Sequence, residues 1–206
     1  LDNKINFKNF DILISSVVPL AEKVFKNYFN KKLIKFFFLR HFLKKTNIKT
    51  NIFNKKEIGE DRLANMIYAK KKFKKSVILI DFGTATTFDV LDKNGIYHGG
   101  VITPGIDISL NTLKSQTAKL PLVKFKKTKN VIGFSTKQAI ESGFFWGYTS
   151  MIEGLVNKIK KEQNDEFSIL LTGGNSNYFK NIFEKSIIDE YFILKSLNFI
   201  LHEYKK

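Results

Sequence analysis

Hydrophobic positions along the chain follow two alternating patterns. Short apolar runs of strand length occur at 10–14, 33–39, 77–80 and 167–171. Apolar residues at helical spacing begin near Pro19, Gly59, Gly105 and Ser135, and the apolar stretch 191–201 predicts a terminal helix. Because strands and helices alternate, the pattern predicts an α/β fold with parallel strands joined by crossover helices.

The stretch at 77–97 organises the rest of the chain. A mostly β-branched run at 77–80 predicts a strand buried on both faces that ends at Asp81. Gly83 and the threonines at 84, 86 and 87 form a small, hydroxyl-rich loop that suits phosphate. Asn94-Gly95 then predicts a tight hairpin turn. Since the loop joins two strands, it is neither a P-loop nor a Rossmann fingerprint, and an ordinary Gly/Thr turn would have the same residues.

Size and composition limit the classes of protein. With 206 residues, 43% hydrophobic and 14% aromatic, the chain can form one large domain or two small lobes. It has no cysteine and three histidines, which excludes disulfides, thiolate nucleophiles and cysteine metal sites. No apolar run approaches the roughly 18 residues of a membrane span, and no signal-peptide pattern precedes Asp11. We therefore expect a cytoplasmic protein with no membrane partner.

The net charge of +16 would suit a nucleic-acid-binding protein. However, only Arg40 and Arg62 are arginine, and the lysines are scattered through every segment. Proteins that recognise a specific nucleic-acid sequence commonly use the bidentate hydrogen bonds of arginine, so we expect no specific nucleic acid partner. Weak non-specific binding at low salt follows from the charge alone.

Six segments resemble a known family. The sequence D-F-G-T-A-T-T-F-D at 81–89 resembles the D-x-G-T-A-T-T-x-D motif of type III pantothenate kinases, which belong to the acetate and sugar kinase/Hsp70/actin superfamily. Five further segments resemble the family's motifs in the same order, namely G-x-D-R at 59–62, G-G-x-I-x-P-G at 99–105, T-A-x-L-P at 117–121, I-G-x-x-T at 132–136 and T-G-G at 172–174. Together they extend over most of the chain, from about residue 10 to residue 174.

The resemblance implies two ribonuclease-H-like lobes with a cleft between them. We place a partial first lobe at 1–75 and the second lobe, with the central loop, at 76–206. The family opens with a D-x-G-N-T phosphate-binding loop, and nothing similar precedes Asp11. The chain also starts at Leu1, so we expect an incomplete first lobe and a fragment of a longer protein.

By resemblance, the function is ATP-dependent phosphorylation of pantothenate to 4′-phosphopantothenate, the first step of coenzyme A biosynthesis. Asp61 corresponds to the general base that takes the proton of the substrate hydroxyl, a reasonable role for a carboxylate in phosphoryl transfer. Substrate-binding positions are Gly59, Glu60, Asp61, Arg62, Thr136 and Ile52. Ile52 departs from the family, which has a tyrosine there.

The resemblance also assigns the nucleotide and the ions. Thr84 and Gly83 would contact ATP phosphate, and Gly173 and Gly174 would lie beside the adenosine. Asp81 would hold a monovalent cation, K⁺ or NH₄⁺, and Mg²⁺ would accompany ATP. Simpler explanations exist for each group. Carboxylates at 60 and 61 suit a first helical turn, Asp81 could cap its own turn, and Gly-Gly is common between a strand and a helix.

Family members are dimers whose substrate pocket lies close to the subunit contact. Phe144, Phe145 and Trp146 are therefore candidates for buried dimer surface, although core packing explains them equally well. Two other functions remain open. A non-catalytic pantothenate kinase paralogue acting as a binding or regulatory protein would explain Ile52 and the missing first loop, and a nucleic-acid-binding protein would explain the charge.

Overall fold

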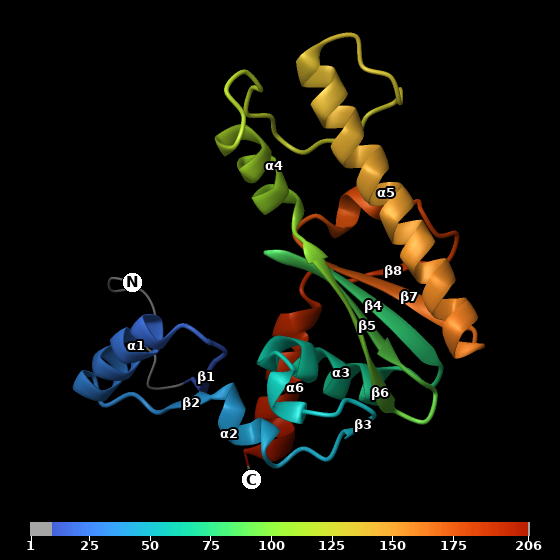
Figure 1. Cartoon of the computed structure of the whole chain (residues 1–206). Coiled ribbons are helices and arrows are strands. Elements are labelled where there is room, and N and C mark those ends of the chain that lie inside the picture. The colour runs from blue at the N-terminus through green and yellow to red at the C-terminus, as the bar shows by residue number, and fades with distance from the viewer. Residues whose placement is uncertain (1–9, 206) are drawn as a thin grey trace. The chain divides into compact units, whose positions relative to one another are not determined.

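The structure is a computed structural model that describes residues 10–205 (Figure 1). The chain forms two compact units. The first contains the residues up to Ile48, Phe53–Lys72 and the segment from Ile193 onward, and the second contains Lys49–Ile52 and Phe73–Phe192. In the described part of the chain, no helix is both long and apolar enough to cross a membrane.

The first unit opens with the predicted β-α-β arrangement. Strand β1 (Ile12–Ile14) pairs in parallel with β2 (Phe36–Phe38), and helix α1 (Pro19–Lys31) connects them. Pro19 occupies the first turn of α1, where no backbone N–H is needed. The strand expected at 33–39 is shorter than predicted, because Leu33 adopts a positive φ of 54° just after α1 and helix α2 (Leu39–Leu43) begins directly after Phe38.

Two helices form the remainder of the first unit. They are α3 (Glu60–Lys72), which follows a short 3-10 helix η2 (Lys55–Glu57), and α6 (Phe192–Tyr204). The rings of Tyr68 and Phe199 lie 5.5 Å apart, and the buried Ser196 hydroxyl donates to Asn65 Oδ1 at 3.0 Å. The basic residues 70–72 form the last turn of α3.

The second unit contains a six-stranded sheet in the order β3-β6-β5-β4-β7-β8. Its strands are β3 (Lys49–Thr50), β4 (Ser76–Phe82), β5 (Ala85–Leu91), β6 (Ile96–Pro104), β7 (Phe167–Gly173) and β8 (Ile187–Ile188). The β4-β5-β6 meander is antiparallel, whereas β4 and β7 are parallel. The short strand β3 lies in the polar tract 44–56, which has no hydrophobic periodicity, and it pairs in parallel with β6.

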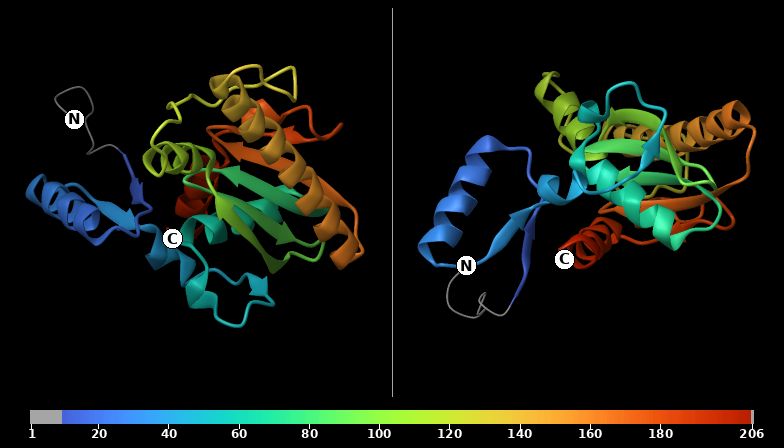
Figure 2. Two further views of the ribbon diagram at one scale, coloured as in Figure 1. Left: turned by 45° about the horizontal axis from the view of Figure 1, so that its top comes forward. Right: turned by 90° about the horizontal axis from the view of Figure 1, so that it is seen from below.

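Helix α5 (Thr136–Gln163) packs across one face of this sheet, as Figures 1 and 2 show, and the first turns of α4 (Ile106–Ser115) add Ile106 and Leu110 to the same core. Strand alternation sends Ile78, Ile80 and Phe82 into this core, where Ile152 and Val156 of α5 meet them. The opposite face therefore carries the alternate residues, including Asp81 at the end of β4.

Two side-chain hydrogen bonds cap the start of α5. Ser135 Oγ accepts a hydrogen bond from the backbone N–H of Gln138 at 3.2 Å, and Gln138 Oε1 accepts one from the backbone N–H of Phe134 at 2.9 Å. The first bond satisfies a donor that the first turn of a helix leaves unpaired, and the second links the residue before the cap to that turn. Gly143 and Gly147 on this helix face open space, so no element of the described chain approaches them closely.

The two compact units do not coincide with the predicted lobes, 1–75 and 76–206. The segment from Ile193 onward groups with the first unit, and Lys49–Ile52 groups with the second. Residues 1–9 of the predicted first lobe lie outside the described residues. The lobe boundary after residue 75 stays a prediction.

Candidate functional site

The turn between β4 and β5 consists of Gly83 and Thr84, and both residues are exposed. It is tighter than the sequence suggested, because β4 extends through Phe82 and β5 starts at Ala85. The backbone N–H of Gly83 donates to the carbonyl of Ala85 at 3.1 Å. The turn therefore presents a hydroxyl and an accessible backbone at the end of two buried strands.

A second turn packs directly against the first. The backbone N–H of Gly105, after the last residue of β6, donates to the Thr84 carbonyl at 3.1 Å. A Cβ atom on Gly105 would lie 2.2 Å from Thr84 O and 2.5 Å from Gly83 O. Only glycine fits at this position. The close packing of Gly105 therefore fixes the backbone conformation of the Gly83–Thr84 turn.

Asp81 lies beside the start of the Gly173–Gly174 turn. Asp81 pairs with Thr172 in the register of β4 and β7, so the carboxyl ends of these parallel strands meet at one edge of the sheet. A Cβ atom on Gly173 would lie 2.6 Å from Asp81 Oδ1, and Gly173 has a positive φ of 86°. Glycine at 173 therefore both allows the turn and leaves room for the carboxylate.

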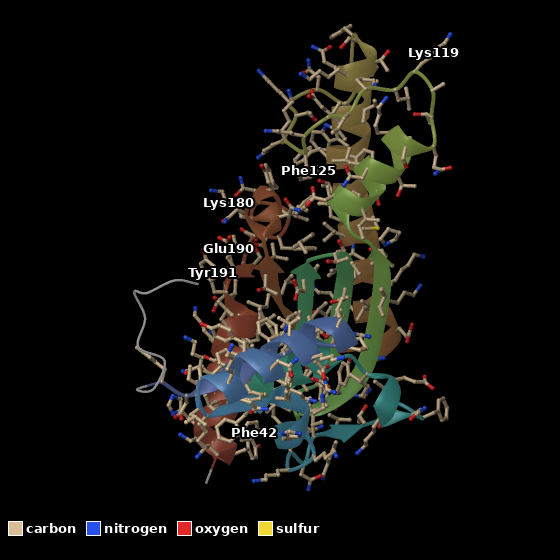
Figure 3. The ribbon with its side chains drawn as sticks, turned by 90° about the vertical axis from the view of Figure 1, so that its left-hand side faces the viewer. Phe42, Lys119, Phe125, Lys180, Glu190 and Tyr191 are labelled. Carbon is tan, nitrogen blue, oxygen red and sulfur yellow. The ribbon has the colours of Figure 1, made fainter. Side chains whose placement is uncertain are left out.

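The segment before α6 supports the Gly173–Gly174 turn. The carbonyl of Glu190 accepts hydrogen bonds from the Gly173 backbone N–H and the Thr172 hydroxyl, both at 3.4 Å. Glu190 and Tyr191 are labelled in Figure 3. The hydroxyl of Ser176, the first residue of the 3-10 helix η3 (Ser176–Phe179), donates to the Gly173 carbonyl at 2.7 Å.

A groove runs past this turn. Its lining comes from the first turns of α4, the segment after α4 and the Gly-Gly turn, namely Asp107, Leu110, Asn111, Leu122, Val123, Lys124, Phe125 and Asn175. Phe125, labelled in Figure 3, packs edge-on against Tyr178 with ring centroids 4.9 Å apart. The groove therefore combines an aromatic wall with amide, ammonium and carboxylate groups.

Asp89 is a buried residue of β5. The buried Tyr97 hydroxyl donates to Asp89 Oδ1 at 2.5 Å, and the Thr87 hydroxyl lies 3.4 Å from Asp89 Oδ2. Thr87 is in turn the cross-strand partner of Asp81. These polar side chains share one face of the sheet, and Asp89 braces the strand that carries the turn.

In the first unit, Gly59–Arg62 lies at the start of α3. The Asp61 side chain is exposed, and its Oδ1 accepts a hydrogen bond from the backbone N–H of Arg62 at 2.8 Å. A Cβ atom on Gly59 would lie 2.6 Å from Asp61 Oδ1. The glycine that precedes the helix thus makes room for the predicted base.

Glu60 points into a charged cluster of the first unit. Its Oε1 lies 3.3 Å from Arg40 Nε, and Arg40 also bonds to Glu22 of α1 and to the Ser16 carbonyl. Burial raises the pKa of the Glu60 carboxyl, although the Arg40 guanidinium acts in the opposite direction. Glu60 therefore has a charged partner in this cluster, whereas the Asp61 side chain is exposed.

The other two predicted substrate positions lie elsewhere in the second unit. Ile52 lies beside Gly99, whose Cβ position would be 3.6 Å from Ile52 Cγ1, in the first half of β6 and away from the turn at its end. Thr136 is exposed at the start of α5, which begins beyond the end of the sheet (Figure 1). The structure does not bring these two residues to the Gly83–Thr84 turn.

The structure does bring together Asp81, Gly83, Thr84 and Gly173, which the sequence places in segments about 90 residues apart. It also adds a residue that no motif indicated, since Tyr97 carries no pattern of its own. Gly105 belongs to the motif at 99–105, but its close packing against the Gly83–Thr84 turn could not be predicted from that motif. Within residues 10–205 no three His, Cys, Asp or Glu side chains form a metal-binding group.

Comparisons with known proteins agree with this arrangement. A family profile described as type III pantothenate kinase matches residues 1–158. The chain is 48% identical over 183 residues to the type III pantothenate kinase of Pelagibacter ubique, covering 86% of this chain and 72% of that protein. It is 38% identical over 203 residues to that of Sulfurihydrogenibium sp., covering 95% of this chain and 81% of that protein.

A solved structure shares the fold. The crystal structure of a conserved putative Baf family transcriptional activator from Campylobacter jejuni superimposes with a TM-score of 0.65 at 23% identity, covering 95% of this chain and 84% of that chain. This likeness shows a shared fold, and it agrees with the α/β class that the sequence predicted. The chain belongs to the type III pantothenate kinase family.

Proposed function

We propose that this protein transfers the γ-phosphoryl group of ATP to pantothenate, giving 4′-phosphopantothenate for coenzyme A biosynthesis. The observation that carries the proposal is the convergence of Asp81, the Gly83–Thr84 turn and Gly173 at one edge of the sheet, in a chain of this family. Each residue had been assigned to the nucleotide or its cation from sequence alone.

Thr84 and Gly83 bind ATP phosphate in this proposal. The turn is exposed and offers a hydroxyl beside backbone groups. The hydrogen bond from Gly105 restricts the turn to one backbone conformation. Phosphoryl transfer depends mainly on positioning and on stabilising charge, so a rigid turn serves it well. The groove past Gly173 and Gly174, with Phe125 and Asn175 in its lining, would receive the adenosine.

Asp61 acts as the general base. Its exposed carboxylate takes the proton of the pantothenate hydroxyl as that oxygen attacks phosphorus. Gly59 keeps the space beside Oδ1 clear, and Arg62 helps to hold the substrate carboxylate through its charge. Glu60, Thr136 and Ile52 complete the proposed set of substrate positions.

The residues present suit a monovalent cation. Asp81 Oδ1 faces a space that a Cβ on residue 173 would fill, and carboxylate oxygen is a ligand for hard cations. Asp81 would hold K⁺ or NH₄⁺, which would offset phosphate charge. Mg²⁺ would be bound through the ATP phosphates, since such sites use few protein carboxylates.

We also infer a homodimer in the cytoplasm, with no membrane and no specific nucleic acid partner. The segment before α5 exposes Val131, Ile132 and Phe134, the last with 85% of its surface accessible. On α5 itself, Gly143 and Gly147 face open space and would allow a helix of a second copy to approach. Large exposed apolar groups of this kind are typical of contact surfaces.

A coupled assay for ADP release tests the proposed function. It uses pantothenate, Mg²⁺ and K⁺ with the purified protein. We expect turnover that needs K⁺ and falls at least 10²-fold in Asp61→Asn, in line with the usual contribution of a general base of about 10²–10⁴-fold. A folded protein without turnover would instead indicate a non-catalytic paralogue.

A further inference from the structure

The peptide group between Pro104 and Gly105 is held at both of its ends. Its N–H, from Gly105, donates to the Thr84 carbonyl at 3.1 Å. Its C=O, from Pro104, accepts a hydrogen bond from the hydroxyl of Tyr148 at 2.9 Å. One peptide plane therefore connects a side chain of α5 with the turn assigned to ATP phosphate.

The Tyr148 hydroxyl is itself oriented by α4. Ser109 Oγ lies 3.1 Å from the Tyr148 hydroxyl oxygen. Because the tyrosine gives its single proton to Pro104, the serine is the donor in this contact. The result is a chain of donors and acceptors that runs from Ser109 through Tyr148 and the Pro104–Gly105 peptide to Thr84.

Such a chain is stiffer than its separate bonds. Each hydrogen bond polarises the next, so loss of the tyrosine hydroxyl weakens the Gly105 to Thr84 bond as well as its own bond. Gly105 also packs on the turn so closely that a methyl group there would overlap Thr84 O. A shift of the Pro104–Gly105 turn is thus transmitted directly to Gly83 and Thr84.

We propose that Tyr148 is a positioning residue for the phosphate-binding turn, and that it acts through the Pro104–Gly105 peptide rather than by touching ATP. This inference rests on the proposed function, since it takes the Gly83–Thr84 turn as the nucleotide site. Tyr148 lies outside every motif that the sequence offered. It tunes the affinity for ATP and leaves the pantothenate site unaltered.

Tyr148→Phe tests the proposal, because it removes the hydroxyl and keeps the ring. The ring stacks on Phe144 with centroids 6.1 Å apart, and that packing survives the substitution. Tyr191→Phe, at an exposed tyrosine of the same unit, makes the same chemical change as a control. Ser109→Ala removes only the donor to Tyr148, and serves as a second variant if Tyr148→Phe does not fold.

We expect the dissociation constant of Mg-ATP, measured by calorimetry, to rise about fivefold in Tyr148→Phe, the effect of losing one hydrogen bond of about 1 kcal/mol. Ser109→Ala should give a smaller rise. In the kinetic assay the KM for ATP should rise while the KM for pantothenate stays within twofold. Tyr191→Phe should match the wild type in both.

Two results would overturn the inference. One is an unchanged affinity for ATP in folded Tyr148→Phe and Ser109→Ala. The other is an equal rise in both KM values together with a fall in melting temperature, which would mean a general structural role. Calorimetry needs no turnover, so a wild type that binds ATP without phosphorylating pantothenate would contradict the proposed function alone.

Discussion

Two glycines leave space for the two carboxylates to which we assign chemistry. Gly59 clears the space beside Asp61, and Gly173 clears the space beside Asp81, each with a Cβ position 2.6 Å from the carboxylate oxygen. Real Cβ atoms do not approach oxygen so closely, so a methyl group at either position must displace the carboxylate or the backbone. Replacing either glycine by alanine therefore tests the position of the neighbouring carboxylate.

Gly173→Ala should destabilise the protein and displace Asp81. The positive φ of 86° strains any side chain, and the added Cβ would also lie 2.7 Å from the Phe82 carbonyl. We expect the free energy of unfolding in urea, followed by circular dichroism, to fall by about 1–3 kcal/mol.

The neighbouring Gly174→Ala provides the matched control. A Cβ at residue 174 meets open space, so its free energy of unfolding should stay within about 0.5 kcal/mol of the wild type. If both variants were equally stable, the crowding at Gly173 described here would be wrong.

Some of these residue-level features could be predicted from the sequence, and others could not. The strand-end position of Asp81 followed from the apolar run before it, and the glycines at 83 and 173 indicated turns. The hydrogen bonds of Tyr97 and Tyr148 could not be predicted, because the first depends on the register of β5 and β6 and the second on the packing of α5 against the end of β6. No local pattern encodes such a contact.

At the scale of elements, the β5–β6 hairpin is held by a carboxylate in its turn. Asp92 Oδ1 accepts hydrogen bonds from the backbone N–H groups of Asn94 at 2.9 Å and Ile96 at 2.8 Å. Asp92 Oδ2 lies 3.0 Å from His98 Nε2. Gly95 supplies the positive φ of 73° that the turn needs.

The stability of the protein should depend on pH through the Asp92 carboxylate in this turn. Burial acts to raise the pKa of Asp92, but the N–H of Ile96, with His98 and Asn94, outweighs it and lowers the pKa. A folded-state pKa below the unfolded one gives stability that is present above the unfolded pKa and is lost as the pH falls through the folded pKa. The free energy of unfolding of Asp92→Asn should therefore be lower than that of the wild type by about 1 kcal/mol at pH 7.

The difference between Asp92→Asn and the wild type should shrink as the pH falls below about 4, the ordinary pKa of the unfolded carboxyl, and through the lower pKa of the folded state. Urea titrations at several pH values measure it. Glu153→Gln, at an exposed position of α5, makes the same change of charge as a control. An equal loss of stability at pH 3 and pH 7 would rule out the charged form of Asp92 as the cause.

Element boundaries were predicted well where local chemistry decides them. The Asn-Gly turn, the cap of α5 at Ser135 and Pro19 at the start of α1 are all confirmed. The exceptions have tertiary causes. Strand β3 has two residues and exists because it pairs with β6, and the apolar run at 33–39 divides into a turn, a strand and a helix.

At the scale of the whole molecule, the charge and the fold point to different partners. The net charge is +16, yet all but two of the 35 basic residues are lysine, and one of the two arginines, Arg40, is engaged by Glu22 and Glu60. The family and the sheet-edge site point to a small-molecule kinase. Charge alone was therefore a weaker guide to function than the order of the motifs.

The proposed dimer can be tested through the exposed segment before α5. Ile132 and Phe134 are 76% and 85% exposed, and burying them against a second copy would favour association by about 1.5–3 kcal/mol for each side chain. Ile132→Glu and Phe134→Glu would place charges in that contact, and we expect both to shift the protein from dimer to monomer in sedimentation equilibrium. Leu194→Glu, at a leucine of the first unit that is 58% exposed, is the control and should remain dimeric. A wild type that is monomeric at every concentration would contradict the dimer, and variants that stay dimeric would move the contact to another surface.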